Sequence, residues 1–268
     1  MREGPSAAVL AAFGISGVPH RLGNGAGAVF RTGGHVLKRG DNAREVAWCA
    51  ATLSGLPQGE FRVAAYRQSA SGSWLVEGWF AQGHLHGDHR TDRWPDVLRT
   101  CRAFHRALSG LDRPAFLAER THLWAVADRI AWGEQPLACH PDLTELVGSL
   151  VRALRPVTLP DQVVHGDFTG NVLFANGFAP AVIDFTPYWR PAAFAEAIVA
   201  VDALVWHRAS PSILDQVANI PEGRQMLLRA EIRRLMEIDG RARRDGTAVL
   251  REIEAHKPVV ELLSAIRS

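Results

Sequence analysis

The sequence predicts an α+β protein in two parts, a small antiparallel β-rich part at residues 1–82 and a larger, mainly helical part at residues 83–268. Two observations support this division. Between residues 21 and 80, short β-like runs alternate with turns and enclose one helical stretch. Beyond Gly83, apolar residues recur at helical spacing through most of the chain.

In the first part we expect the order strand, strand, helix, strand, strand. The four expected strands are 28–31, 35–38, 61–68 and 73–80. Thr32, Gly33 and Gly34 form a turn between the first two, which predicts a hairpin. The helix is expected from Asn42 to Leu53, with Asp41 or Asn42 as its cap.

The second part is expected to be helical except for one β segment at 162–185, which holds two short strands. Its expected helices are 95–108, 123–132, 143–154 and the stretch from 192 to the end, with breaks at Pro211, Pro221, Gly246 and Pro258.

The composition excludes several classes of protein. Hydrophobic residues make up 47% of the 268, enough for a sizeable core, and 30 basic residues nearly balance 28 acidic ones. A net charge of +2 gives no general attraction to nucleic acid or membranes, so we expect neither as a partner. Three widely spaced cysteines favour reduced thiols in a cytoplasmic protein, and no apolar run has the length of a membrane span. The oligomeric state has no sequence signal.

The strongest functional signal is the segment 163–174, Val-Val-His-Gly-Asp-Phe-Thr-Gly-Asn-Val-Leu-Phe, followed by Ala-Val-Ile-Asp-Phe at 181–185. An apolar run precedes Asp167, a second follows Asn171, and a third ends at Asp184. We expect these three side chains at the ends of two adjacent short strands. Phosphoryl transfer uses such a set, because one carboxylate orients the acceptor hydroxyl while an amide and a second carboxylate hold magnesium.

The tripeptide at 165–167 with Asn171, followed by Ile-Asp-Phe at 183–185, resembles the catalytic and metal loops of the aminoglycoside phosphotransferase and choline kinase-type family. The resemblance implies a bilobal protein-kinase-like fold. It also implies a kinase that moves the γ-phosphoryl group of ATP to a hydroxyl of a small molecule, with Asp167 as catalytic base and Asn171 and Asp184 as Mg²⁺ ligands. A second His-Gly-Asp at 86–88 lacks these neighbours, and we expect it to be a loop.

One feature departs from the family pattern. Only Phe168, Thr169 and Gly170 separate Asp167 from Asn171, one residue fewer than in kinases. Gly170 could absorb the tighter path by adopting a positive φ. The alternative is a pseudokinase, a nucleotide- or protein-binding module without turnover.

Nucleotide contacts are expected from the first part. A glycine-rich turn there could place backbone N–H groups over phosphates, or could be a structural hairpin turn; it consists of Gly23, Asn24, Gly25, Ala26 and Gly27. Lys38 ends the next strand, where kinases have a phosphate-binding lysine, and Glu45 lies seven residues on, where it could pair with Lys38. The alternatives are a solvated lysine and a surface pair on the helix.

The run 74–80 is expected to be the last strand of the small part and the connector to the second. The resemblance implies that backbone groups of Glu77 and Trp79 bind the adenine edge.

Supporting roles are less defined. Glu196 and Asp202 are alternative candidates for bracing the catalytic loop from a helix. We interpret His165 as a loop-bracing hydrogen-bonding residue and His105 as a core histidine. Segment 186–191 is expected to shape the acceptor pocket. The basic clusters at 229–234 and 241–244 indicate a solvated helix face or, alternatively, an anionic acceptor.

Overall fold

The computed structural model describes residues 4–22, 28–245 and 249–266. The chain forms two compact units, one made of residues 1–89 and 172–183 and the other of residues 90–171 and 184–268. The predicted α+β class is confirmed. The two predicted parts are consecutive in the chain, whereas the first unit also includes residues 172–183. These residues join it because β9 (Ala181–Val182) pairs in parallel with β4 (Arg62–Val63) and antiparallel with β8 (Val172–Leu173).

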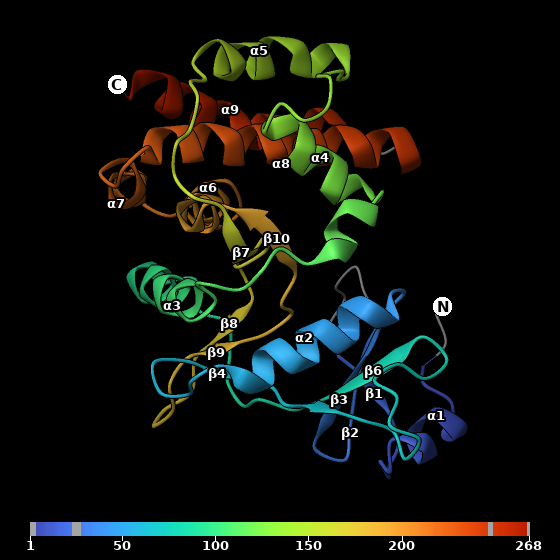
Figure 1. Cartoon of the computed structure of the whole chain (residues 1–268). Helices are drawn as coiled ribbons and strands as arrows, with labels where there is room; N and C mark the ends of the chain where they lie inside the picture. The colour runs from blue at the N-terminus through green and yellow to red at the C-terminus, as the bar shows by residue number, and fades with distance from the viewer. Residues whose placement is uncertain (1–3, 23–27, 246–248, 267–268) are drawn as a thin grey trace. The chain divides into compact units, whose positions relative to one another are not determined.

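The first unit contains a five-stranded antiparallel sheet in the order β1-β2-β3-β6-β5 (Figure 1). Its strands are β1 (His20–Arg21), β2 (Val29–Thr32), β3 (His35–Arg39), β5 (Tyr66–Arg67) and β6 (Trp79–Gly83). Gly33 and Gly34 have φ of 53° and 74°, which confirms the hairpin between β2 and β3. A Cβ on Gly33 would lie 2.7 Å from the carbonyl oxygen of Ser16, so only glycine fits there.

The helix α2 (Ala43–Gly55) is confirmed, with Asn42 as its cap: the Asn42 side chain accepts hydrogen bonds from the backbone N–H groups of Arg44 and Glu45. Two strand predictions were wrong. The single strand expected at 61–68 is split into β4 and β5 because the two halves pair with different sheets. The strand expected at 73–80 begins only at Trp79, and the residues before it form a turn.

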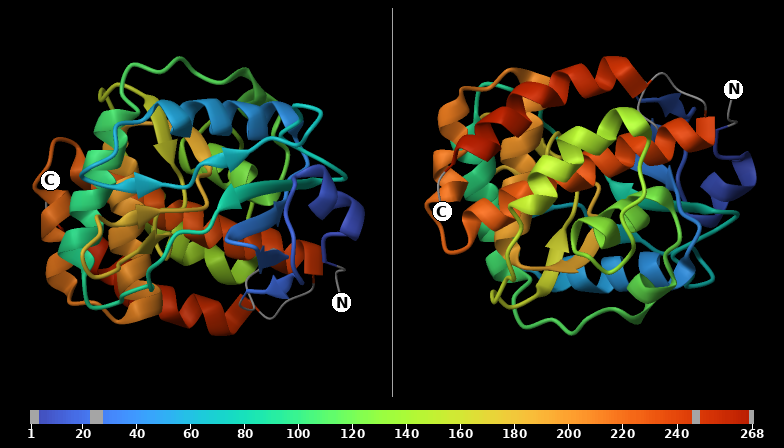
Figure 2. Two further views of the ribbon diagram at one scale, coloured as in Figure 1. Left: turned by 90° about the horizontal axis from the view of Figure 1, so that it is seen from below. Right: turned by 90° about the horizontal axis from the view of Figure 1, so that it is seen from above.

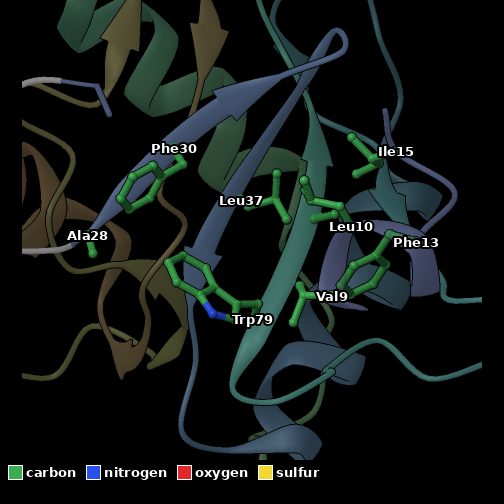
Figure 3. Close-up of a cluster of buried hydrophobic side chains, with 9 residues drawn as sticks. Val9, Leu10, Phe13, Ile15, Ala28, Phe30, Leu37 and Trp79 are labelled. Carbon is green, nitrogen blue, oxygen red and sulfur yellow. The ribbon is translucent and has the colours of Figure 1, made fainter. Parts of the chain in front are cut away.

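The core of this unit lies between α1 (Ala7–Ala12) and one face of the sheet (Figure 3). Buried residues of α1 and the chain just after it meet buried residues of β2, β3 and β6; the cluster comprises Val9, Leu10, Phe13, Ile15, Ala28, Phe30, Leu37, Trp79 and Ala81. The rings of Phe30 and Trp79 pack edge to face at 5.7 Å. Lys38 alternates with Leu37 along β3, so its side chain leaves the opposite face of the sheet.

The second unit is mainly helical. Its α-helices are α3 (Trp94–Ala107), α4 (Leu123–Ala131), α5 (Thr144–Arg152), α6 (Ala192–His207), α7 (Asp215–Ala218), α8 (Gly223–Asp245) and α9 (Val249–Ala265). Short 3₁₀ turns occur at η1 (Ala115–Glu119), η2 (Pro141–Leu143) and η3 (Pro211–Ile213). Figure 2 shows α5, α8 and α9 side by side, and α8 also packs on α4 and α6. The helix break expected at Pro258 was wrong, since α9 continues through it.

A two-stranded antiparallel ribbon, β7 (Gln162–His165) with β10 (Pro187–Arg190), completes the second unit. The strand before Asp167 therefore pairs with a strand that the sequence did not predict. The strand β7, which precedes Asp167, is not adjacent to β9, which precedes Asp184. The expectation that two adjacent strands carry all three site residues was therefore wrong. Within the described ranges, no helix has both the length and the apolar character needed to cross a membrane.

Candidate active site

The β7–β10 ribbon determines where two of the predicted site residues lie. His165 is paired with Pro187, and the ladder extends by one further bond, from the N–H of Gly166 to the carbonyl of Thr186 at 2.9 Å. In an antiparallel register this sets Asp167 beside the residues that follow Asp184. Both carboxylates therefore leave the same end of the ribbon, and both residues are exposed in the second unit.

Gly166 is required by the packing of this ribbon. A Cβ at position 166 would lie 2.2 Å from Cδ2 and 2.5 Å from Cε2 of Tyr188, which is only 5% exposed. The Tyr188 ring is itself held between the guanidinium groups of Arg233, 4.4 Å from the ring centroid, and Arg120, 5.3 Å from it. The glycine thus lets the chain turn tightly against a fixed aromatic ring immediately before Asp167.

A chain of buried hydrogen bonds braces the loop from below. The N–H of Asp167 donates to Nδ1 of His165 at 3.2 Å, and the N–H of His165 donates to Nε2 of His105 at 2.9 Å. Because that Nε2 accepts, the His105 proton must lie on Nδ1, which donates to the carbonyl of Cys101 at 2.7 Å. Burial lowers the pKa of His105 to about 3, so the ring stays neutral. These contacts confirm the interpretations of His165 as a brace and His105 as a satisfied core histidine.

The shortened loop brings Asn171 back to Asp167. Gly170 has a φ of 72°, as expected, and the Asn171 N–H donates to the carbonyl of Phe168 at 3.1 Å. The side-chain Nδ2 of Asn171 donates to the backbone carbonyl of Asp167 at 2.6 Å. This bond fixes the amide, so its Oδ1 remains available as an oxygen ligand.

Asp184 lies at an unusual backbone position. Its φ is 53°, in the left-handed region, which Asp tolerates better than most side chains but which still costs free energy. The turn is closed by the hydroxyl of Thr186, which donates to the Asp184 carbonyl at 2.9 Å. Carboxylate and amide oxygens are the ligands that Mg²⁺ prefers, so the donor set of Asp184 and Asn171 fits that ion.

A buried arginine, expected from the sequence to lie on a solvated basic face, holds the other side of Asp167. Arg234 of α8 donates to Oδ1 of Asp167 at 3.2 Å and forms bonds of 2.5 and 2.7 Å to the carboxylate of Asp202 on α6. It also donates to Glu237 at 2.9 Å. Burial acts to lower the pKa of Arg234, but Asp202 and Glu237 outweigh it and raise that pKa well above the ordinary value. The guanidinium is therefore a permanent charge beside the predicted catalytic carboxylate.

This network bears on the choice between Glu196 and Asp202. Within the described residues the Glu196 carboxylate bonds to Arg102 of α3 at 2.7 Å and not to the catalytic loop. Asp202 reaches Asp167 through Arg234, so Asp202 is the candidate linked to the loop. The basic cluster at 229–234 is buried rather than a solvated face, and the structure corrects that interpretation. The sequence could have indicated this burial only through the apolar residues that lie between these arginines along the helix.

A cavity of about 320 Å³ opens beside Asp167. Its walls come from α4, α6 and α8 together with the catalytic loop, all in the second unit. Segment 186–191, predicted to shape an acceptor pocket, lines a second cavity of about 410 Å³ through Tyr188, Trp189 and Arg190, and its role toward the acceptor stays a prediction.

Nucleotide contacts were expected from the first unit. Lys38 lies in β3 opposite Phe80 and is half-buried, and Glu45 lies in the first turn of α2. A Cβ on Gly40 would meet both Val46 of α2, at 3.1 Å, and Phe80, at 3.2 Å. The start of α2 therefore packs on the face of the sheet that carries Lys38 and Phe80. The predicted phosphate turn, Gly23 to Gly27, lies outside the described residues.

Glu77 and Trp79 are not on the connector. They precede and begin β6, and Glu77 (φ 48°) and Gly78 (φ 74°) form a tight turn in which Val76 and Trp79 exchange backbone hydrogen bonds of 2.8 and 2.9 Å. The Glu77 carbonyl accepts a bond from Arg39 at 3.0 Å. The chain leaves this sheet only after Gly83. Binding of adenine by backbone groups of Glu77 and Trp79 stays a prediction. It can no longer be supported by a place on the connector, because neither residue lies there. The second His-Gly-Asp, at 86–88, is a loop, as expected.

Comparison with known proteins identifies the family and the fold of the chain. A family model described as the phosphotransferase enzyme family (APH) matches residues 28–188, more than half of the chain. The chain therefore belongs to the phosphotransferase enzyme family. No curated protein matches the chain.

Several solved structures share the fold. A thermostable mutant of aminoglycoside phosphotransferase APH(4)-Ia is 16% identical, with a TM-score of 0.63 over 96% of this chain and 98% of that one. Spectinomycin phosphotransferase APH(9)-Ia, solved with ADP and spectinomycin, is 13% identical, with a TM-score of 0.59 over 96% of each chain. A choline/ethanolamine kinase family protein from Mesorhizobium loti is 16% identical, with a TM-score of 0.59 over 94% and 90%. These likenesses confirm the protein-kinase-like fold.

Proposed function

We propose that this phosphotransferase is an ATP- and Mg²⁺-dependent kinase that transfers the γ-phosphoryl group to a hydroxyl of a small molecule. The observation that carries the proposal is Asp167: an exposed carboxylate at the end of a rigid ribbon, held by Arg234 and Asn171, beside a cavity of small-molecule size. The solved relatives with ADP, spectinomycin or hygromycin B support the same chemistry.

Asp167 would accept the hydrogen bond of the acceptor hydroxyl and aim its oxygen at the γ-phosphorus. As the new O–P bond forms, the bond from that phosphorus to the bridging oxygen breaks and ADP leaves, while the hydroxyl proton passes to the Asp167 carboxylate. Arg234 holds Oδ1 of Asp167 at 3.2 Å, and the Asn171 amide donates to Oδ2 at 3.5 Å, so Oδ2 is the more weakly held oxygen and the one that would face the acceptor. Positioning of this kind supplies most of the rate enhancement in phosphoryl transfer.

Asn171 and Asp184 would hold Mg²⁺, which neutralises phosphate charge when bound. Lys38 would bind the phosphates and Glu45 would orient it. The glycine-rich turn at 23–27 would cover them.

The test is transfer of phosphate from ATP to a metabolite extract, followed by mass shift, with the intact protein and the variant Asp167→Asn. We expect transfer to fall by roughly 10²- to 10⁴-fold in the variant. Thermal stabilisation by ATP and Mg²⁺ should persist in Asp167→Asn and weaken in Asp184→Asn. The matched control is Asp112→Asn, an exposed carboxylate outside the site.

Equal transfer by Asp167→Asn and the unmodified protein would contradict the catalytic assignment. Nucleotide binding without transfer to any component of the extract would instead establish the pseudokinase alternative. The return of Asn171 to Asp167 through Gly170 argues against that outcome, because the shortened loop still brings the two residues together.

A further inference from the structure

The cavity beside Asp167 has a floor made by one face of α8. Arg234, Glu237, Ile238 and Arg241 line it at the spacing i, i+3, i+4 and i+7, which places them in one stripe of the helix. Gly240 allows this floor to lie close to α4, because a Cβ there would come within 3.2 Å of the Cβ of Leu123. The charges along this stripe determine which acceptors the cavity can hold.

The carboxylates in the cavity are already neutralised by arginines. Asp202 is paired with Arg234 at 2.5 Å, and Glu237 is paired with Arg234 at 2.9 Å and with Arg233 at 3.0 Å. Asp202 and Glu237 are nearly inaccessible, with side-chain exposures of 4% and 5%. Within the described lining, Asp167 is the one carboxylate with substantial exposure, at 52%.

A second arginine, at the rim of the cavity, is paired as well. Arg241 lines the cavity with a side-chain exposure of 31% and pairs with Glu252 of α9. A polycationic acceptor would therefore meet guanidinium groups and carboxylates that are already paired, and bringing it in would leave its ammonium groups without partners.

Aromatic rings supply the remaining binding surface. Trp124, in the first turn of α4, and Trp206, at the end of α6, both line the cavity and are 40% and 47% exposed. Large exposed aromatic side chains in a cavity are a signal of ligand binding rather than of folding. The Trp206 ring is set by the buried ring of His256, which packs edge to face with it at 5.5 Å, so its exposed surface has a fixed position.

The inference that follows rests on the proposed function. We propose that the acceptor is a small hydroxylated ring compound without positive charge. It would be a glycoside or cyclitol of about one or two rings, and its apolar face would stack on Trp124 and Trp206. The cavity of about 320 Å³ lies at the lower end of the range for small-molecule sites, which suits this size. The exposed indoles could also attract a quaternary ammonium by cation–π interaction, but Asp202 and Glu237, which could balance its charge, are already paired with Arg234. The experiment must therefore distinguish a choline-type acceptor from a neutral one.

The experiment is saturation-transfer-difference NMR on the intact protein, with AMP-PNP and Mg²⁺ present throughout. The probes are methyl β-D-glucopyranoside, phenyl β-D-glucopyranoside and myo-inositol, compared with choline and hygromycin B. We expect saturation of ring C–H protons of at least one neutral probe and none of choline or hygromycin B. The affinity for that probe should fall about tenfold in Trp206→Ala and in Trp124→Ala.

The control is Phe178→Ala, which removes an aromatic ring of 63% exposure outside this cavity and should leave probe binding unchanged. Arg241→Glu should allow hygromycin B or choline to bind, because it places an unpaired carboxylate at the rim of the cavity. Any of three results would overturn the inference. These are absence of signal from all three neutral probes, preference for choline or hygromycin B in the unmodified protein, and unchanged binding in both tryptophan variants. Thermal stabilisation by ATP and Mg²⁺, measured on nucleotide-free samples of the same proteins, reports on the proposed function separately, so the two can fail independently.

Discussion

The close contact between Gly166 and Tyr188 gives the most direct test of how this loop is built. In Gly166→Ala the new Cβ would lie 2.2 Å from the Tyr188 ring, whereas ordinary contact begins near 3.4 Å, so ring and backbone must separate by more than 1 Å. The ring is 5% exposed and lies between Arg120 and Arg233, so a shift of the ring must displace one of these side chains. Since φ at position 166 is not positive, the cost is steric and not a matter of backbone strain.

We expect Gly166→Ala to lower the free energy of unfolding by about 3 kcal/mol, the upper end for overpacking in a fixed core. Urea denaturation measures this cost. The matched control is Gly170→Ala, where nothing lies within 4 Å of the new Cβ and φ is 72°. That control should cost only about 1 kcal/mol, the penalty for a left-handed alanine.

A double-mutant cycle isolates the contact. In the Tyr188→Ala background the ring is gone, so Gly166→Ala should cost less than about 1 kcal/mol, and the coupling energy should be about 2 kcal/mol or more. The loop shift should also reduce kcat, because Asp167 is the next residue. A cost of Gly166→Ala that is equal in both backgrounds, or one below that of Gly170→Ala, would refute the steric reasoning.

Two further predictions concern buried charge. Because burial lowers the pKa of His105 from 6.5 in the unfolded chain to about 3, the unfolded state binds more protons between these values. The free energy of unfolding should therefore decrease as the pH falls from about 6.5 towards 3, by up to roughly 1.4 kcal/mol per pH unit. Denaturation at several pH values should show a weaker dependence of this free energy on pH in His105→Gln. An equal pH dependence in the variant would contradict a neutral, buried His105. Arg234→Met should cost about 3–5 kcal/mol, because it leaves Asp202 buried without its charged partner. Arg99→Ala, which removes an arginine of 73% exposure, should cost less than about 1 kcal/mol by the same denaturation assay; similar costs for the two would show that the Arg234 network is not buried in solution.

Much of the local structure could be read from the sequence because it depends on short-range geometry. The hairpin at Gly33 and Gly34 follows from residues that accept a positive φ, and α2 begins where Asn42 can cap it. The loop from Asp167 to Asn171 is equally local, so the return of Asn171 through Gly170 could be anticipated from the missing residue.

Strand pairing could not be read in this way. Segments 61–68 and 181–185 look like simple strands, but the first is divided between two sheets, and only Ala181 and Val182 of the second pair, with both β4 and β8. The strand β10 begins with a proline and has the aromatic residues of a loop. Trp79 shows the same limit: its run of apolar residues indicates a strand, but only pairing with β3 determines that the strand begins there and ends at Gly83. Which strands pair depends on contacts far apart in the chain, and short apolar runs are compatible with several partners.

The sequence by itself determined the class of chemistry, because Asp167, Asn171 and Asp184 lie in short segments whose order and spacing are visible in one dimension. Only the tertiary structure decided what surrounds them. Arg234 lies 67 residues from Asp167, and its charge reaches that carboxylate because α8 packs on α6. An arginine in a helix can face solvent or a buried acid, and only packing settles which; the same packing neutralises Asp202 and Glu237 and brings Trp124 and Trp206 to one cavity. The proposed acceptor surface is therefore a property of the fold, since it arises from helices that are distant in sequence.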